Sequence, residues 1–212
     1  MRRETRMFQR SAGAAVLALL LVAGCSQSSS SPDSSVAAAT ATPPQPITAR
    51  TALGPIYKSA LAWTSDVQLL SLKPKDVPGF KNEAGKAAMW EALVASPSKR
   101  QRRTYSYSIA AVAPGIHKGT DSTPPMPWAG VTRDVMPIDL SIFTIDSDAA
   151  YQAANHEAVD WLKKNPDKPL SSLEIETTSK FSSPVWYVQW GDKKAGYIAL
   201  VDAASGKAYK SK

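Results

Sequence analysis

Few residues of this 212-residue chain have the types and spacing that catalysis or metal binding requires. His156-Glu157 is followed by Asp160, so the zinc-protease pattern, which needs a second histidine four residues after the first, is broken. The other histidine, His117, lies in a segment rich in glycine and proline, where we expect no ligand role. The chain contains neither a Gly-x-Ser-x-Gly elbow nor a phosphate-binding loop. We therefore expect no metal, no cofactor and no enzyme activity.

Paired carboxylates are the remaining catalytic alternative, because a glycoside hydrolase needs two of them beside a sugar cleft. Asp146 and Asp148 precede a helical pattern, where capping of the helix explains them. Glu174 and Glu176 alternate along a predicted strand, on the side that we expect to face solvent. Neither pair is singled out by its surroundings, so a hydrolase is the least favoured function.

The single cysteine, Cys25, closes a segment with the properties of a secretory signal. Four arginines form a positive n-region: Arg2, Arg3, Arg6 and Arg10. The uncharged apolar run 14–23 is shorter than the about 20 residues that span a bilayer, and it fits the length of a signal-peptide core. The sequence Leu21-Val22-Ala23-Gly24-Cys25 resembles the bacterial lipobox, in which a small residue precedes a cysteine that is lipidated. The alternative is an ordinary signal peptide with an incidental cysteine.

The lipobox resemblance implies that residues 1–24 are removed and that acyl chains on Cys25 anchor the mature protein outside the cytoplasm. Ser26, rather than an aspartate, follows the cysteine. By resemblance to Gram-negative sorting rules, this favours the outer membrane, with the protein facing the periplasm. In a cell with a single membrane, the anchor would lie on the outer face of the cytoplasmic membrane.

Residues 25–50 are rich in serine, proline and alanine, and we expect a flexible tether there. The whole chain carries a formal charge of +7, and the removal of residues 1–24 leaves +4. This mild charge does not indicate a nucleic-acid partner.

Residues 51–212 are enough to bury a sizeable core, and a helix followed by strands occurs in them twice. In 51–145, we expect Gly54-Pro55 to open a helix, and strands at 66–72, 88–95 and 104–111. In 146–212, Asp146 precedes a helix that ends before Pro166, and strands follow at 173–177, 185–190 and 196–202. The sequence therefore predicts an α+β fold of two tandem helix-plus-antiparallel-sheet units. The alternative is one continuous sheet without a true duplication.

The second unit also resembles a known family. Its segments Ser183–Trp190 and Tyr197–Lys207, the latter containing Val201-Asp202-Ala203-Ala204-Ser205-Gly206, resemble the C-terminal half of PepSY-like domains. The resemblance covers residues 146–212. It implies a helix followed by an antiparallel sheet, and a role in binding or inhibition rather than in catalysis.

A basic cluster is the first candidate contact surface. It lies in a predicted turn and consists of Lys99, Arg100, Arg102 and Arg103. These four charges equal the net charge of the mature chain, and they could contact anionic lipid headgroups or an acidic partner. The alternative is a solvated turn that protects a strand edge from aggregation.

The second candidate contact surface is formed by Trp186 and Trp190. Both faces of their strand are apolar, whereas a sheet that is covered on one side needs only one apolar face. Either the second face packs on the other unit, or it is an exposed aromatic binding surface.

We therefore expect a lipid-anchored cell-envelope protein that acts as a non-catalytic protein-binding or inhibitory module. Its partners would be the membrane, through the lipid on Cys25, and an envelope protein. A structural or assembly lipoprotein of the envelope is the alternative, and a hydrolase acting on envelope material comes third.

Overall fold

The computed structural model of the protein describes residues 44–112, 114–192 and 194–211. The predicted signal peptide, Cys25 and most of the predicted tether lie outside the described residues. Within the described part, no helix has the length and apolar character needed to cross a membrane.

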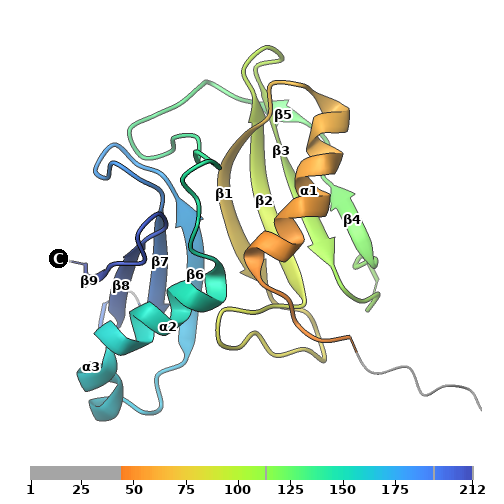
Figure 1. The fold of residues 1–212 in the computed structure, drawn as a ribbon. Helices are drawn as coiled ribbons and strands as arrows, with labels where there is room; N and C mark the ends of the chain where they lie inside the picture. The colour runs from red at the N-terminus through yellow and green to blue at the C-terminus, as the bar shows by residue number, and fades with distance from the viewer. Residues whose placement is uncertain (1–43, 113, 193, 212) are drawn as a thin grey trace, which may run out of the picture. The chain divides into compact units, whose positions relative to one another are not determined.

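The described residues form an α+β fold, as the sequence predicts (Figure 1). The helices are α1 (Ala49–Trp63), α2 (Ser147–Glu157) and α3 (Val159–Lys164), and the strands are β1 (Gln68–Lys75), β2 (Met89–Ser96), β3 (Gln101–Ser108), β4 (Gly119–Ser122), β5 (Met126–Pro127), β6 (Leu170–Glu176), β7 (Val185–Trp190), β8 (Tyr197–Asp202) and β9 (Ala208–Lys210).

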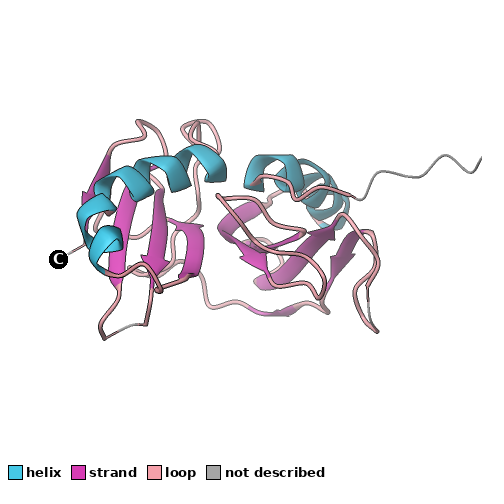
Figure 2. Ribbon diagram, turned by 90° about the horizontal axis from the view of Figure 1, so that it is seen from below, coloured by secondary structure: helices cyan, strands magenta, loops and turns pink. Residues whose placement is uncertain are grey.

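These strands make one antiparallel sheet in the order β4-β3-β2-β1-β6-β7-β8-β9, with β5 paired to β3. The helix-plus-sheet arrangement occurs twice within it. We call α1 with β1–β5 the first unit, and α2 and α3 with β6–β9 the second unit. In each unit the helices lie along one face of the strands, and α1 and α2 contribute to one shared hydrophobic core (Figure 2).

One buried contact is common to both units. Trp90 of β2 and Trp186 of β7 are each fully buried, and each donates its indole N–H to a carbonyl oxygen at 2.9 Å. The acceptors are Ile47 and Ile145, which lie two residues before α1 and α2. A buried indole N–H needs such a partner, so this bond fixes where the chain enters each helix.

The expected start of the first helix is wrong. The helix begins at Ala49, and Pro55 lies inside it rather than at its first turn. Proline removes one helical hydrogen bond, but α1 buries a complete apolar stripe that includes Ala49, Ile56 and Ala60, and this burial outweighs the loss. The folded part also begins before residue 51, because Ile47 pairs with Ala87.

Two short strands, β4 and β5, lie in the glycine- and proline-rich region that follows His117, where the sequence predicts no strand. Strand β4 contains Gly119 and only polar residues after it, and β5 has two residues, of which one is proline. Neither shows the apolar alternation that predicts a strand. Their pairing with β3 is a tertiary effect.

The two units are locked together where the N-termini of α1 and α2 meet. The backbone N–H of Ala49 donates to Ser147 Oγ at 2.9 Å, and the N–H of Arg50 donates to Asp146 Oδ1 at 3.0 Å. The same Asp146 oxygen accepts from the backbone N–H of Ser147 and so caps α2, as predicted. One carboxylate of the second unit therefore serves the first turns of both helices.

Candidate functional site

The basic cluster lies at the tip of the β2–β3 hairpin, but its four side chains are not equivalent. Arg103 is half-buried, and its guanidinium donates to Thr123 O at 2.9 Å and to Ser122 Oγ at 3.0 Å. It also lies 5.5 Å from the ring centres of Trp63 and Tyr105. Arg103 is therefore part of the fold.

The other three cations of the hairpin are exposed. Lys99 Nζ lies 5.7 Å from the ring centre of Trp63, at the end of α1. Arg100 has a left-handed backbone with φ +50, and Arg102 alternates with Arg103 along β3. Since neighbouring residues of a strand point to opposite faces, Arg102 lies on the face away from α1.

A polar hub holds the base of this hairpin. Asp66 accepts hydrogen bonds from Thr64 Oγ1, from Ser96 Oγ at 2.7 Å and from the backbone N–H of Ser98 at 2.7 Å. The hydrogen bond from Thr64, followed by those from Ser98 and Ser96, holds the pKa of Asp66 well below its ordinary value. The Asp66 carboxylate therefore stabilises the turn that presents Lys99 and Arg100.

Trp186 and Trp190 are not an exposed contact surface. Their side chains are 0% and 3% exposed to solvent, because the face of β7 that carries them packs against α2. Tyr151 of that helix lies 6.2 Å from Trp190, centre to centre. The opposite face of β7 packs within its own unit, where Phe181 meets Tyr187 edge-on at 6.4 Å. The segment around Phe181 explains why both faces of this strand are apolar.

The residues considered for catalysis are not gathered into one site. His117 and His156 are both exposed, and the described residues contain no group of three possible metal-ligating side chains. Glu174 and Glu176 are half-buried rather than fully on the solvent side. Burial raises the pKa of Glu176, and the nearby charges of Glu174 and Asp134 raise it further.

A hollow lies where the two units meet, and sequence reasoning missed it. Strands β1 and β6 pair only at Ser71 with Glu176 and at Leu72 with Ile175. Beyond these pairs they diverge and leave a cleft of about 610 Å³. The wall from the first unit is Lys73–Lys75, and the wall from the second is Leu170–Leu173.

Pro74 explains why this seam opens. The β1–β2 ladder continues past Pro74 to Lys75, so the Pro74 nitrogen points away from β2 and towards β6. Continuation of the β1–β6 register would place Pro74 opposite Leu173. Proline has no N–H to donate there. The edges of both strands are therefore left facing each other across the cleft.

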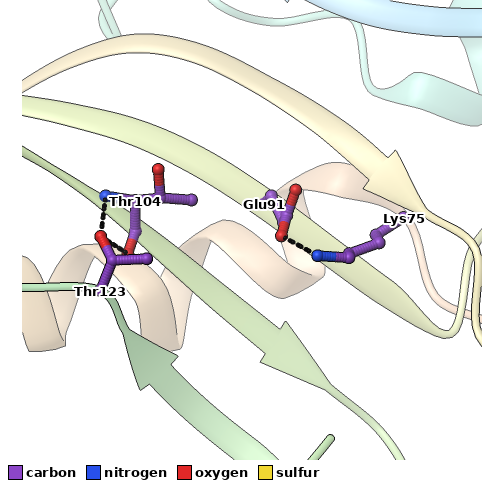
Figure 3. A network of polar contacts seen from close by, with 4 residues as sticks. All are labelled: Lys75, Glu91, Thr104 and Thr123. Carbon is purple, nitrogen blue, oxygen red and sulfur yellow. Dashed lines mark hydrogen bonds and ion pairs between the residues drawn. The ribbon is translucent and has the colours of Figure 1, made fainter. Parts of the chain in front are cut away.

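The cleft carries more cations than acids. Lys73, Lys75 and Lys81 line it, together with Asp76 and Glu91. The Lys75 ammonium pairs with Glu91 at 2.7 Å across β1 and β2 (Figure 3), and Asp76 accepts from the Asn82 amide at 2.8 Å. These contacts partner both acids. Lys73 is exposed beside the two strand edges and has no ion pair within the part of the chain that the structure describes.

No family model matches this chain, and no curated protein matches it. Among solved structures, the chain is similar to a crystal structure from Clostridium difficile 630 that is described as that of a candidate lipoprotein. The sequence identity is 11% and the TM-score is 0.47, over 79% of this chain and 95% of that chain. A likeness at this level carries no argument about function.

Proposed function

We propose that this protein is a lipid-anchored, non-catalytic binding module of the cell envelope, built from two PepSY-like units. The lipobox ending at Cys25 supports the anchor, and the Ser183–Lys207 resemblance supports the family assignment of the second unit. The shared indole contacts of Trp90 and Trp186 support the extension of that assignment to the first unit.

The observation that carries the binding role is the open seam between β1 and β6. An extended polypeptide that enters a sheet edge gains main-chain hydrogen bonds without a specific sequence. Here one segment would meet two edges, at Lys73–Lys75 and at Leu170–Leu173. The occupant that we propose is an extended segment of an envelope protein.

The charges that line the cleft indicate which kind of segment it would favour. Lys73 is exposed on one wall, and Ser172 is exposed on the other. A bound segment with an acidic side chain next to Lys73 would be favoured over a basic one, chiefly in its association rate. A hydrolase has less support, because the half-buried pair Glu174 and Glu176 is not part of the lining of this cleft.

The test uses the mature chain, residues 25–212 with Cys25→Ser, immobilised and exposed to envelope extract of the source cells. Ser172→Trp fills the cleft from an exposed wall position, and Ser182→Trp adds the same side chain at an exposed serine away from the cleft. We expect a partner to be retained by the unaltered chain and by Ser182→Trp, and to bind Ser172→Trp more than tenfold more weakly.

Amide hydrogen exchange of the captured complex then locates the contact. Slower exchange in 170–174 on partner binding supports the cleft. Equal retention by both tryptophan variants would overturn the cleft as the site, and the absence of any partner on all three columns would overturn the binding role.

A further inference from the structure

Two exposed apolar side chains of the described residues, Met126 and Val131, lie beside exposed cations of the hairpin. Among the described residues, five large hydrophobic side chains are exposed, and three of them, Met126, Val131 and Val135, lie in one segment. Met126 and Val131 are each 56% exposed to solvent. Nothing in the described part of the chain covers them, so they are available to a surface outside the protein.

Hydrogen bonds hold this segment against the hairpin. Strand β5 pairs with β3, which puts Met126 beside Arg102. The backbone N–H of Trp128 donates to Arg100 O at 2.9 Å. Upstream, Thr123 and Thr104 exchange hydrogen bonds at 2.9 and 3.1 Å and tie the segment to β3 (Figure 3). The segment with Met126 and Trp128 is therefore held next to Arg100 and Arg102.

We call this surface the basic–apolar tip. It consists of Lys99, Arg100, Arg102, Met126, Trp128 and Val131. Pro97, Arg100, Trp128 and Val131 share the lining of one open hollow of about 480 Å³.

We propose that the basic–apolar tip docks on an anionic phospholipid surface. The cations would contact the lipid headgroups, and the exposed apolar side chains would reach the start of the acyl chains. The half-buried Trp128 suits the interface between these two regions. Asp66, at the base of the hairpin, directs its carboxylate to hydrogen bonds with Thr64, Ser96 and the backbone N–H of Ser98 rather than to an ion pair with these cations.

The distance from the predicted anchor permits this contact. α1 has 15 residues and is about 22 Å long, and its last residue, Trp63, lies under Lys99. The tip is therefore about one helix length from the point where the chain enters the fold (Figure 1). Residues 26–43, which separate Cys25 from the first described residue, reach at most about 60 Å when extended. This proposal concerns a different surface from the cleft and does not depend on it.

The test is co-sedimentation of the chain 25–212 with Cys25→Ser, so that acyl chains contribute nothing. The probes are vesicles of phosphatidylcholine alone and vesicles with a third of phosphatidylglycerol. We expect binding to the anionic vesicles only. Arg100→Ala with Arg102→Ala should weaken it about thirtyfold, because a cation near an anionic surface contributes about 1 kcal/mol. Met126→Ser with Val131→Ser should weaken it at least fivefold.

Matched controls remove the same kinds of side chain elsewhere. Lys163→Ala with Lys164→Ala removes two exposed cations of α3, and Leu61→Ser with Val159→Ser removes two exposed apolar groups. Both controls should bind within about twofold of the unaltered chain. No binding to anionic vesicles would overturn the proposal. Sensitivity to the arginines but not to Met126 and Val131 would overturn the apolar part of the proposal, because the contact with the vesicles would then be electrostatic alone.

Discussion

The two units share their central contact and differ at their edges. In both, the buried tryptophan of the second strand holds the residue two positions before the helix. In the first unit, the β2–β3 hairpin presents exposed cations, and Asp66 holds its base. In the second, aromatic pairs close the surface instead: Trp161 lies 5.7 Å from Tyr197, and Phe181 lies 6.3 Å from Tyr209. The common part builds the fold, and the surfaces available for binding lie where the units diverge or meet.

The largest effect is expected at the contact between the units. Gly85 has φ +80, and a Cβ there would lie 2.3 Å from Ser147 O and 2.6 Å from Asp148 Cα. Both atoms are backbone, so Gly85→Ala should lower the free energy of unfolding by about 3 kcal/mol or more. Urea denaturation would measure it.

The control for that prediction is Gly79, which has nearly the same backbone, φ +83, and nothing within 4 Å of the added carbon. Gly79→Ala should therefore cost only about 1 kcal/mol. Equal effects of the two substitutions would mean that the strained backbone, and not the contact between the units, limits stability.

The shared tryptophan contact predicts that substitution of either tryptophan destabilises the fold by a similar amount. Trp90→Phe and Trp186→Phe each remove buried volume and one hydrogen bond to a carbonyl oxygen, although the carbonyl oxygen of Ile47 keeps a second donor, the backbone N–H of Ala87 at 2.9 Å. Each should lower the free energy of unfolding by about 2–4 kcal/mol. The two values, measured by thermal or urea unfolding, should agree within about 1 kcal/mol. A large effect of one and a negligible effect of the other would break the equivalence of the units.

A smaller loss is expected at the helix N-termini. Ser147→Ala removes the hydroxyl oxygen that accepts the buried hydrogen bond from the N–H of Ala49. This should lower the free energy of unfolding by about 1–2 kcal/mol. Ser141→Ala, at an exposed serine bonded only to nearby Asp139, should change the urea midpoint little. If the two variants unfold alike, the bond between the units contributes nothing measurable.

The smallest effect is expected in the pH dependence of stability, which compares one aspartate from each unit, Asp66 and Asp202. Partial burial raises the pKa of Asp202, but hydrogen bonds from Ser183 and Ser205 outweigh it, so the pKa lies below its ordinary value, as that of Asp66 does. A carboxylate with a lowered folded pKa stabilises the fold above the unfolded value of about 4, and this stabilisation is lost as the pH falls below it.

Asp66→Asn and Asp202→Asn should therefore both be less stable than the unaltered chain at pH 7, and the difference should shrink between pH 4 and pH 2. Urea midpoints across that range would measure it. A difference that does not change with pH would mean that neither carboxylate acts through its charge.

Much of the local structure follows from the residues, whereas the places where distant segments meet do not. The capping of α2 by Asp146 and the strand β7 follow from local patterns, and both were predicted. Pro55 misled the prediction of α1, because the helix is stabilised across the proline by packing of its apolar stripe against the sheet, and this tertiary contact is not visible in the local sequence. The pairing of Leu72 with Ile175 joins strands about a hundred residues apart, and no local pattern indicates it. The cleft depends on this pairing, so it could not be predicted.

The opening of the seam at Pro74 is the central claim, and amide exchange at β6 tests it most directly. The N–H of Ile175 lies in the paired part, and that of Leu173 lies opposite Pro74. We expect slow exchange at Ile175, fast exchange at Leu173, and slow exchange at both in Pro74→Val, which restores the missing donor and lets the ladder extend. Equally slow exchange at both amides of the unaltered chain would contradict the account, because the seam would then be closed.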